Sequence, residues 1–581
     1  MMRRRMFQLL LVIAVVLGGS LYLKNCGRKK EAPDQSRVDE LFSEWNRPDT
    51  PGAGVAVIRD GAVVFRKDYG MANLEYGIPI TPEAVFHAAS VSKQFTACAV
   101  AMLAEQGQLS LDADIHTYLP ELMDFGGVVT VRHLIHHTSG LRDQLELAAM
   151  AGFRLDDVIS QDHVWNLITS QKALNFVPGS EYMYCNSGYT LLAEIVARVT
   201  GESFRDWTRK NIFDPLGMLK TQFRDDYTQV VADAACSYEP DESGAYKKKV
   251  LSYSNFGATG LLTTVDDMVK WLLNMENGRV GGPEVGRLML EQGTLNDGRM
   301  ISYAFGLEVG EHRGLKTVDH DGYDAGFRSA LLWFPEQRFA VVMLSNNGAV
   351  DPGETARRIA DIYLSREYEE KEASPAPVRK GVDVDPIFLD KYDGKYLLEN
   401  ERIITVSREG GRLLFQGSGP DKLELLAESD TAFFIQGTDI KLSFELNNVG
   451  MVMRLVLHQR DREVEGKRIT VTPFSPEQAV SYAGTYLSEE LGAVYSVVYD
   501  KGRLGLRHMR YGDIPLTHLI GDTFRCDRWW LRSVRFIKDE EGRVTGFAMT
   551  GDRVRNLRFD KAGLAPPQRP AESNPFQESK A

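Results

Sequence analysis

The 581-residue sequence has few cysteines and no excess of basic residues. Its five cysteines include no Cys-x-x-Cys pair, which argues against a disulfide scaffold and against a cysteine-rich zinc site. Lys and Arg number 68 against 80 Asp and Glu, a net charge of -12, whereas surfaces that bind nucleic acid usually carry a basic excess. We therefore expect no nucleic-acid partner, and folded domains held together by ordinary hydrophobic burial, since 43% of the residues are hydrophobic.

One long apolar run lies near the N-terminus. Residues 6–23 are apolar apart from Gln8 and Ser20, and basic residues flank both ends. These 18 residues approach the length of about 20 that spans a bilayer, and they also fit the apolar centre of a signal peptide. We expect residues 1–30 to be a signal peptide or an uncleaved membrane anchor and residues 31–45 to be a polar tether. The rest of the chain is then extracytoplasmic, either periplasmic or secreted.

The next part of the chain shows strand patterns at both ends. Two β-rich runs, residues 55–58 and 62–67, surround Asp60-Gly61 and predict a hairpin. Two more strands, residues 329–334 and 339–344, are predicted near residue 365. Helical periodicity lies between them, notably over residues 90–106 and 190–199. We therefore expect residues 46–365 to form one α+β domain, in which both ends build a single antiparallel sheet flanked by helices.

The remainder of the chain contains an internal repeat. Residues 366–384 are charged and contain Pro375 and Pro377, which is typical of a linker. The pattern Tyr392-Asp393-Gly394-Lys395-Tyr396 then recurs as Tyr482-Ala483-Gly484-Thr485-Tyr486, and Phe444 has its counterpart in Phe536.

A period near ninety residues fits two copies of a small β-domain, each long enough for about eight strands. We expect two small antiparallel, lipocalin-like β-barrels, residues 385–472 and 473–562, and a disordered tail over residues 563–581.

Ser90-Val91-Ser92-Lys93 opens the first predicted helix. A spacing of three residues puts Ser90 and Lys93 on one helix face, where the amine can meet the hydroxyl. The start of a helix also presents backbone N–H groups that can stabilise an oxyanion. Taken alone, such a short pattern arises by chance, and Ser90 could equally be a helix cap beside a solvated lysine.

Further motifs follow in order. They are Phe86–Ala97 around the Ser-x-x-Lys pattern, His137-Thr138-Ser139-Gly140-Leu141, Tyr184-Cys185-Asn186-Ser187-Gly188-Tyr189, and the stretch from His320 to Phe327. With these motifs the sequence resembles the serine β-lactamase and penicillin-recognising family, nearest its class C-like branch of esterases and D-aminopeptidases. The resemblance covers residues 46 to 365. The appended barrels resemble the D-aminopeptidase layout.

The resemblance implies a site in which Ser90 becomes acylated. Lys93 and Tyr184 form a coupled pair that takes the Ser90 proton, and which of them is the formal base is left open. Burial is expected to lower the pKa of Lys93, and the nearby cation that of Tyr184. Asn186 is expected to hold the acyl side of the substrate. The backbone N–H groups of Ser90 and Tyr323 are expected to form the oxyanion hole.

Two look-alike motifs compete with these assignments. Tyr253-Ser254-Asn255 is also Tyr-x-Asn, and His312-Arg313-Gly314 is also His-x-Gly. We prefer Tyr184 for its Ser-Gly-Tyr context before a helix, and His320-Asp321-Gly322 because it leads directly into the strand pair.

His320 stands where typical β-lactamases carry a lysine. Histidine is mostly neutral at pH 7 and holds a β-lactam carboxylate less strongly. We therefore expect a serine hydrolase of small peptides, amides or esters rather than an efficient β-lactamase. The alternatives are a slowly deacylating sensor of β-lactams or peptidoglycan fragments, and a protein that carries an apolar ligand in its barrels.

No cofactor or metal is predicted. Several histidines cluster in the helical region, but no His-Glu-x-x-His pattern accompanies them, so packing and capping roles are expected. They are His87, His133, His136, His137 and His163.

Overall fold

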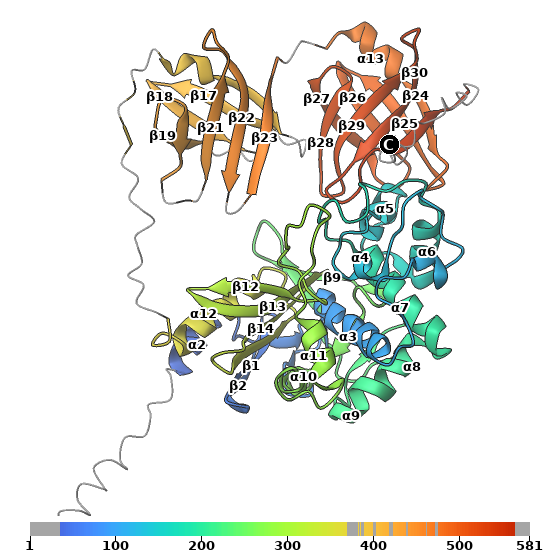
Figure 1. Cartoon of the computed structure of the whole chain (residues 1–581), viewed down its shortest axis with the longest axis vertical. Coiled ribbons are helices and arrows are strands. Elements are labelled where there is room, and N and C mark those ends of the chain that lie inside the picture. Colours follow the sequence, from blue (N-terminus) through green and yellow to red (C-terminus); the bar gives the residue numbers. More distant parts are fainter. Residues whose placement is uncertain are drawn as a thin grey trace, which may run out of the picture.

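A computed structural model gives the arrangement of the chain (Figure 1). The structure describes residues 35–368, 381–382, 384, 388–398, 403–417, 422–436, 438, 440–459, 462–470 and 474–563. An α/β domain lies at one end of the molecule, and two barrels lie at the other (Figure 1). The predicted leader, most of the predicted linker and all but the first residue of the predicted tail lie outside the described residues.

The α/β domain is built on a six-stranded antiparallel sheet in the order β12-β13-β14-β15-β1-β2. Strands β1 and β2 come from the start of the domain and β12 to β15 from its end, so β1 pairs with β15. The prediction of one antiparallel sheet built from both ends is confirmed. The strands are β1 (Ala53–Arg59), β2 (Ala62–Tyr69), β12 (Glu308–His312), β13 (Leu315–Asp324), β14 (Phe327–Phe334) and β15 (Phe339–Ser345).

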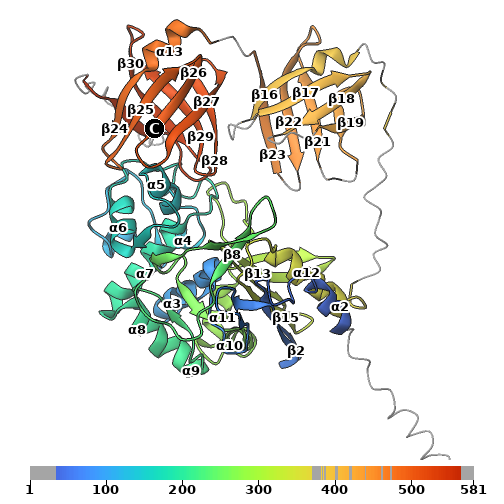
Figure 2. The ribbon, with the colours of Figure 1, turned by 180° about the vertical axis from the view of Figure 1, so that it is seen from behind.

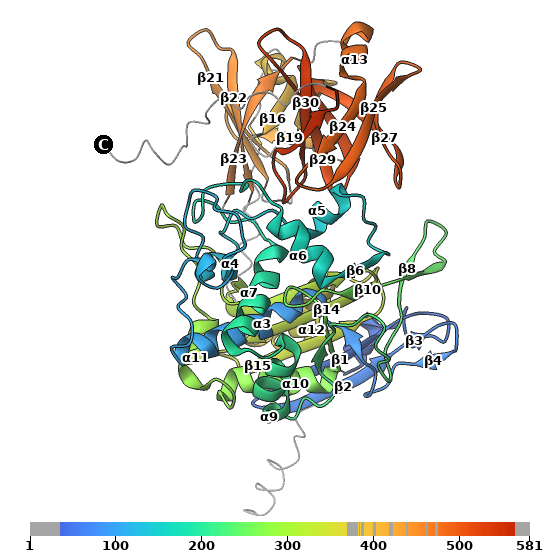
Figure 3. The ribbon, with the colours of Figure 1, turned by 90° about the vertical axis from the view of Figure 1, so that its right-hand side faces the viewer.

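Alternating side chains of the sheet enter two apolar cores. One face packs against α2 (Gln35–Leu41) and α12 (Pro352–Tyr363), where Val55 and Val57 of β1 are buried. The other face contributes Ala56 and Ile58 to the larger core beneath the helical region. Figure 3 shows this helical layer in front of the sheet. Its helices include α3 (Ser92–Glu105), α4 (Val131–Ile135), α5 (Gln144–Met150), α6 (Gln161–Thr169), α7 (Asn186–Thr200), α8 (Phe204–Thr208), α10 (Val265–Asn277) and α11 (Gly282–Met289).

Three local features differ from the sequence-based expectation. The helix expected from residue 90 begins as a single 3-10 turn, η1 (Ala89–Val91), and becomes α-helical at Ser92. Helix α7 starts at Asn186, one turn before the predicted residue 190, and ends at Gly201 with φ +70°. Helix α2 lies in the segment expected to be a tether, because Val38 can be buried against the sheet.

Each repeat forms a closed eight-stranded barrel, which confirms the two predicted barrels. The first runs from β16 (Gly394–Leu398) to β23 (Arg462–Ile469), and the second from β24 (Gly484–Ser488) to β31 (Leu557–Lys561). The repeated tyrosines make the same contact in both. Tyr396 Oη donates to the Tyr392 carbonyl at 2.8 Å, and Tyr486 Oη donates to the Tyr482 carbonyl at 2.6 Å.

The remaining barrel strands are β17 (Ile403–Glu409), β18 (Arg412–Gln416), β19 (Leu423–Ala427), β20 (Ala432–Phe434), β21 (Lys441–Leu446), β22 (Val452–Gln459), β25 (Ala493–Asp500), β26 (Arg503–His508), β27 (Gly512–Ile520), β28 (Thr523–Arg528), β29 (Leu531–Lys538) and β30 (Val544–Thr550). Helix α13 (Pro476–Tyr482) precedes the second barrel.

The second barrel sits on helix α5 of the α/β domain, as the view from behind also shows (Figure 2). Leu147 and Met150 of α5 join one apolar core with the interior of this barrel. Tyr495 Oη donates to the Met150 carbonyl at 3.0 Å, and buried Arg142 pairs with buried Glu490 at 2.5 Å. The second barrel is therefore part of the same packed body as α5.

The described residues contain no helix that is both long and apolar enough to cross a membrane. The apolar run at residues 6–23 lies outside them, so the expected anchor or signal peptide stays a prediction.

Candidate active site

Ser90 lies in a strained turn that the surrounding chain holds in place. Ala89, just before it, has φ +47°, a left-handed conformation that costs a non-glycine residue about 1–3 kcal/mol. The Ala88 amide donates to the Leu261 carbonyl at 2.8 Å, and Ser92 Oγ donates to the Ala89 carbonyl at 2.5 Å. This places the Ser90 hydroxyl at the start of α3, on the wall of a cavity of about 310 Å³.

Lys93 is fully buried one turn further along and its amine points at Ser90. Nζ lies 3.2 Å from Ser90 Oγ and donates to Asn186 Oδ1 and to the Ala258 carbonyl, both at 2.8 Å. Burial lowers the pKa of Lys93 to about 7, as expected from the sequence. A substantial fraction of the amine is therefore unprotonated at neutral pH and can accept a proton.

Tyr184 also reaches the Ser90 side of the cavity, but its ionisation differs from the expectation. Burial raises the pKa of Tyr184 well above its usual value and outweighs the nearby Ser90 hydroxyl and Arg553 cation, which act the other way. The phenol is therefore protonated. Its ring packs against His137 at an interplanar angle of 38°, with 4.3 Å between centroids, and the Cys185 amide donates to His137 Nδ1 at 3.1 Å. The His137 motif thus positions the Tyr184 loop.

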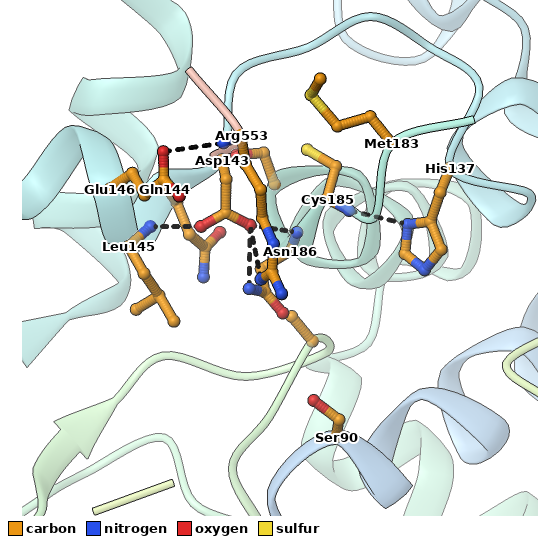
Figure 4. Close-up of polar contacts among 12 residues, drawn as sticks. Ser90, His137, Asp143, Gln144, Leu145, Glu146, Met183, Cys185, Asn186 and Arg553 are labelled. Carbon is orange, nitrogen blue, oxygen red and sulfur yellow. Dashed lines mark hydrogen bonds and ion pairs between the residues drawn. The ribbon is translucent and has the colours of Figure 1, made fainter. Parts of the chain in front are cut away.

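Asn186 is held by an acid that sequence reasoning missed. Asp143 Oδ2 accepts hydrogen bonds from the Asn186 backbone amide at 2.7 Å and from Asn186 Nδ2 at 2.9 Å. Its other oxygen, Oδ1, accepts from the Leu145 amide at 2.9 Å and caps α5 (Figure 4). These contacts turn the amide oxygen of Asn186 toward Lys93.

Strand β13 forms the opposite wall and packs closely on the Ser90 turn. A Cβ on Gly322 would lie 2.2 Å from Ser329 Oγ and 2.7 Å from the Ala88 carbonyl, so only glycine fits there. Ser329 Oγ itself donates to that carbonyl at 2.8 Å. Tyr323 follows on the same strand and lines the cavity. The expected backbone donors of Ser90 and Tyr323 therefore come from two segments in tight contact.

His320 lies in the cavity wall as a neutral ring. Burial lowers its pKa to about 3. Nδ1 lies 2.7 Å from the Asp321 carbonyl, to which it donates, so Nε2 accepts from Tyr303 Oη at 3.0 Å. His320 therefore supplies no fixed positive charge to a substrate.

The predicted residues Ser90, Tyr184, Asn186, His320 and Tyr323 all line this one cavity, and Lys93 contacts it through Ser90. The look-alike residues do not line it. Further cavity residues are Asp321 and Asp324, which lie in the matched stretch from His320 but were given no role, and Leu145, Thr259, Glu308, Asp319, Arg357 and Arg553, which sequence reasoning missed.

The histidines outside the cavity wall make structural contacts. His133 and His163 complete capping boxes at α4 and α6, and His136 Nε2 lies 3.1 Å from the Glu291 carbonyl. His87 lies 3.0 Å from both Asp324 and Thr259.

A serine hydroxyl that lies beside a buried amine of lowered pKa, a protonated tyrosine and the start of a helix can carry out acyl transfer. Together the fold and this cavity define a serine hydrolase. The chain belongs to the family described as Beta-lactamase, whose model matches residues 38–364.

The similarity to other proteins supports this family assignment. A D-aminopeptidase of Gluconobacter oxydans is 30% identical over 327 residues, which are 56% of this chain and 61% of that protein. A D-aminopeptidase of Brucella melitensis biotype 2 is 27% identical over 88% of this chain and 96% of its own length. The octameric penicillin-binding protein homologue from Pyrococcus abyssi has the same fold, with a TM-score of 0.53 and 24% identity over 75% of this chain and all of that chain.

A second model, described as a domain of unknown function (DUF3471), matches residues 379–473. This segment coincides with the first barrel.

Proposed function

We propose that this chain hydrolyses small amides and peptides through an acyl-enzyme on Ser90. The observation that carries the proposal is the buried Lys93 amine, of pKa about 7, placed 3.2 Å from Ser90 Oγ. A serine hydroxyl is a weak nucleophile without such an acceptor. The two relatives above are named D-aminopeptidases, which also supports an amide substrate.

The proton path follows from the two pKa shifts. Ser90 Oγ bonds to the substrate carbonyl carbon while its proton passes to the neutral Lys93 amine. The Tyr184 hydroxyl, which stays protonated, donates its proton to the leaving amine as the C–N bond breaks and recovers one from Lys93. Water then attacks the ester carbonyl, Lys93 takes a proton from this water, and Ser90 Oγ leaves with that proton returned by Lys93. Each cycle adds one water across the amide bond.

The two alternatives differ in what the structure supports. A slowly deacylating sensor would use the same Ser90 site, so only kinetics separates it from a hydrolase. A ligand carrier would need free space inside a barrel, whereas buried aliphatic and aromatic side chains pack together in the described part of each barrel and α5 packs against the second. The hydrolase is therefore preferred.

The test compares wild type with Ser90→Ala by intact mass and by turnover. Both proteins are incubated with a fluorophosphonate, p-nitrophenyl butyrate, a panel of acyl p-nitroanilides and nitrocefin. Labelling and turnover that both disappear in Ser90→Ala support the proposal. A stable adduct without turnover would favour the sensor, and wild type that is neither labelled nor active would contradict a nucleophilic Ser90.

We further propose that the enzyme works outside the cytoplasm. Support comes from the apolar run at residues 6–23 with basic residues on both sides. Cell fractionation of the full chain beside a variant lacking residues 1–30 tests this, and recovery of both forms in the cytoplasm would contradict it.

A further inference from the structure

One wall of the cavity comes from the second barrel. The loop between β30 and β31, residues 551–556, reaches over α5 and places Arg553 in the cavity with Ser90 and Tyr184. Its backbone is fixed: the Arg553 amide donates to Glu146 at 2.9 Å, and its carbonyl accepts from the Asp143 amide at 3.2 Å and from Asn175 at 2.9 Å. Figure 4 shows the side chain extending down past Asp143 and Asn186.

The Arg553 guanidinium is held close to the reacting groups. Its central carbon lies 4.9 Å from the centre of the Tyr184 ring, and Lys93 Nζ lies 4.7 Å from the same point. The Arg553 guanidinium and the Lys93 amine therefore both lie against one aromatic ring, and Lys93 is the group that contacts Ser90. A group bound by Arg553 would lie only a few bonds from the carbonyl that Ser90 attacks.

The Arg553 guanidinium donates no hydrogen bond to another described residue. Within the described part of the chain it forms one ion pair, with Asp143 at 3.9 Å, and Asp143 already accepts hydrogen bonds from Leu145 and Asn186. The Arg553 side chain remains 40% exposed, toward the cavity it lines. A guanidinium offers five N–H donors in a fork that matches a carboxylate, so its free donors favour an anionic ligand group.

Charge in the cavity is separated between its walls. Asp321 and Asp324 lie on β13 and Glu308 lies on β12, whereas Arg553 lies on the loop of the second barrel. Asp319 on β13 is paired with Arg357. Burial raises the pKa of Glu146, beneath the Arg553 loop, to about 8. Asp143, whose oxygens already accept hydrogen bonds from Leu145 and Asn186, is the carboxylate paired with Arg553 on this side. A substrate carboxylate is therefore favoured on the Asn186 side and an ammonium is disfavoured there.

We propose that Arg553 selects substrates whose acyl portion carries a carboxylate a few bonds from the scissile carbonyl, rather than a free amine beside it. This inference rests on the proposed Ser90 hydrolase. Arg553 acts on substrate choice, and its charge also lowers the pKa of Lys93, an effect that is the same for every substrate.

The test uses substrates that share one leaving group. Succinyl and glutaryl p-nitroanilide, their neutral methyl esters and D-alanyl p-nitroanilide are compared by kcat/KM. For wild type we expect a preference for the better free acid over its methyl ester of roughly 10- to 100-fold, the range of a charge-assisted hydrogen bond. Arg553→Gln is expected to remove this preference and Arg553→Lys to keep part of it. Arg555→Gln is the matched control, because Arg555 is on the same loop but pairs with Glu181.

The ratio of kcat/KM for the free acid to kcat/KM for its methyl ester measures recognition of the carboxylate alone, because a change in Lys93 affects both substrates alike. Equal ratios in wild type and Arg553→Gln, or a wild type that prefers D-alanyl p-nitroanilide, would contradict the selection by Arg553 while leaving the hydrolase intact. Absence of any Ser90-dependent turnover, p-nitrophenyl butyrate included, would contradict the hydrolase and this inference with it.

Discussion

Lys93 and Tyr184 both lie at the Ser90 hydroxyl, yet burial moves their proton affinities in opposite directions. A buried ammonium loses stability relative to the neutral amine, and a buried phenolate loses stability relative to the phenol. The pKa of Lys93 is therefore lowered to about 7 and that of Tyr184 is raised. The choice of base that the sequence left open is thus assigned to Lys93 in the proposed mechanism.

A pH profile tests this assignment. Because the neutral amine is the acceptor, kcat/KM should be low below pH 6, rise through an apparent pKa near 7 and level off above pH 8. Lys93→Arg keeps a cation but removes the base, and should lower kcat/KM by roughly 100- to 10,000-fold. A wild-type profile that rises only above pH 9 would assign the proton to another group.

Tyr184→Phe separates activity from stability. The buried Tyr184 hydroxyl has no hydrogen-bond partner of good geometry among the described residues, so its removal should leave the free energy of unfolding unchanged or raise it by up to about 1 kcal/mol. Activity on amides should fall sharply, because the leaving amine loses its proton donor. Urea unfolding beside amide and ester kinetics measures both effects. A destabilised variant would mean that the hydroxyl is structurally required.

At the scale of elements, β13 and η1 are pressed together at Gly322. A methyl group there would collide with Ser329 Oγ and the Ala88 carbonyl. Gly322→Ala should cost about 1–3 kcal/mol of stability and should lower kcat/KM by displacing the Ser90 turn. Gly310→Ala on β12 is the control, since its Cβ would meet only Thr317 Oγ1 at 3.4 Å. Equal effects of the two substitutions would show that the contact at η1 is unimportant.

The sequence predicted those features that depend only on residues close together in the chain. The Asp60-Gly61 turn produced the β1–β2 hairpin, and the Ser90 and Lys93 spacing produced the contact of 3.2 Å. The 3-10 turn at Ala89 was not predictable, because contacts with distant strands stabilise its strained backbone. Nor were Asp143 and Arg553, since the two meet only when residues some 400 positions apart fold together. No signal in the sequence links them except that Asp143 follows the His137–Leu141 motif.

At the scale of the whole molecule, the second barrel and the α/β domain share a buried ion pair. Removing one partner of such a pair leaves an uncompensated buried charge, which typically costs about 3–5 kcal/mol. Arg142→Ala should therefore lower the stability of the docked barrel and expose the junction to limited proteolysis. Glu490 is the charge left alone.

Lys172→Ala is the matched control across the same junction. Lys172 pairs with Glu489 at 2.6 Å, but their side chains are 37% and 71% exposed, so its loss should cost less than about 1 kcal/mol. Similar proteolysis of the two variants would contradict a role for the buried pair in docking.

The position of Arg553 in the sequence also determines when, during synthesis, substrate selection becomes possible. Synthesis proceeds from the N-terminus, and domains generally fold as they emerge. The nucleophile and its base are made within the first hundred residues, whereas the arginine that completes the cavity wall is made more than 400 residues later. A nascent α/β domain would thus carry the reactive groups without Arg553, and only the fully synthesised chain would discriminate between substrates. Fragments ending before the second barrel are then expected to be unselective rather than merely weak.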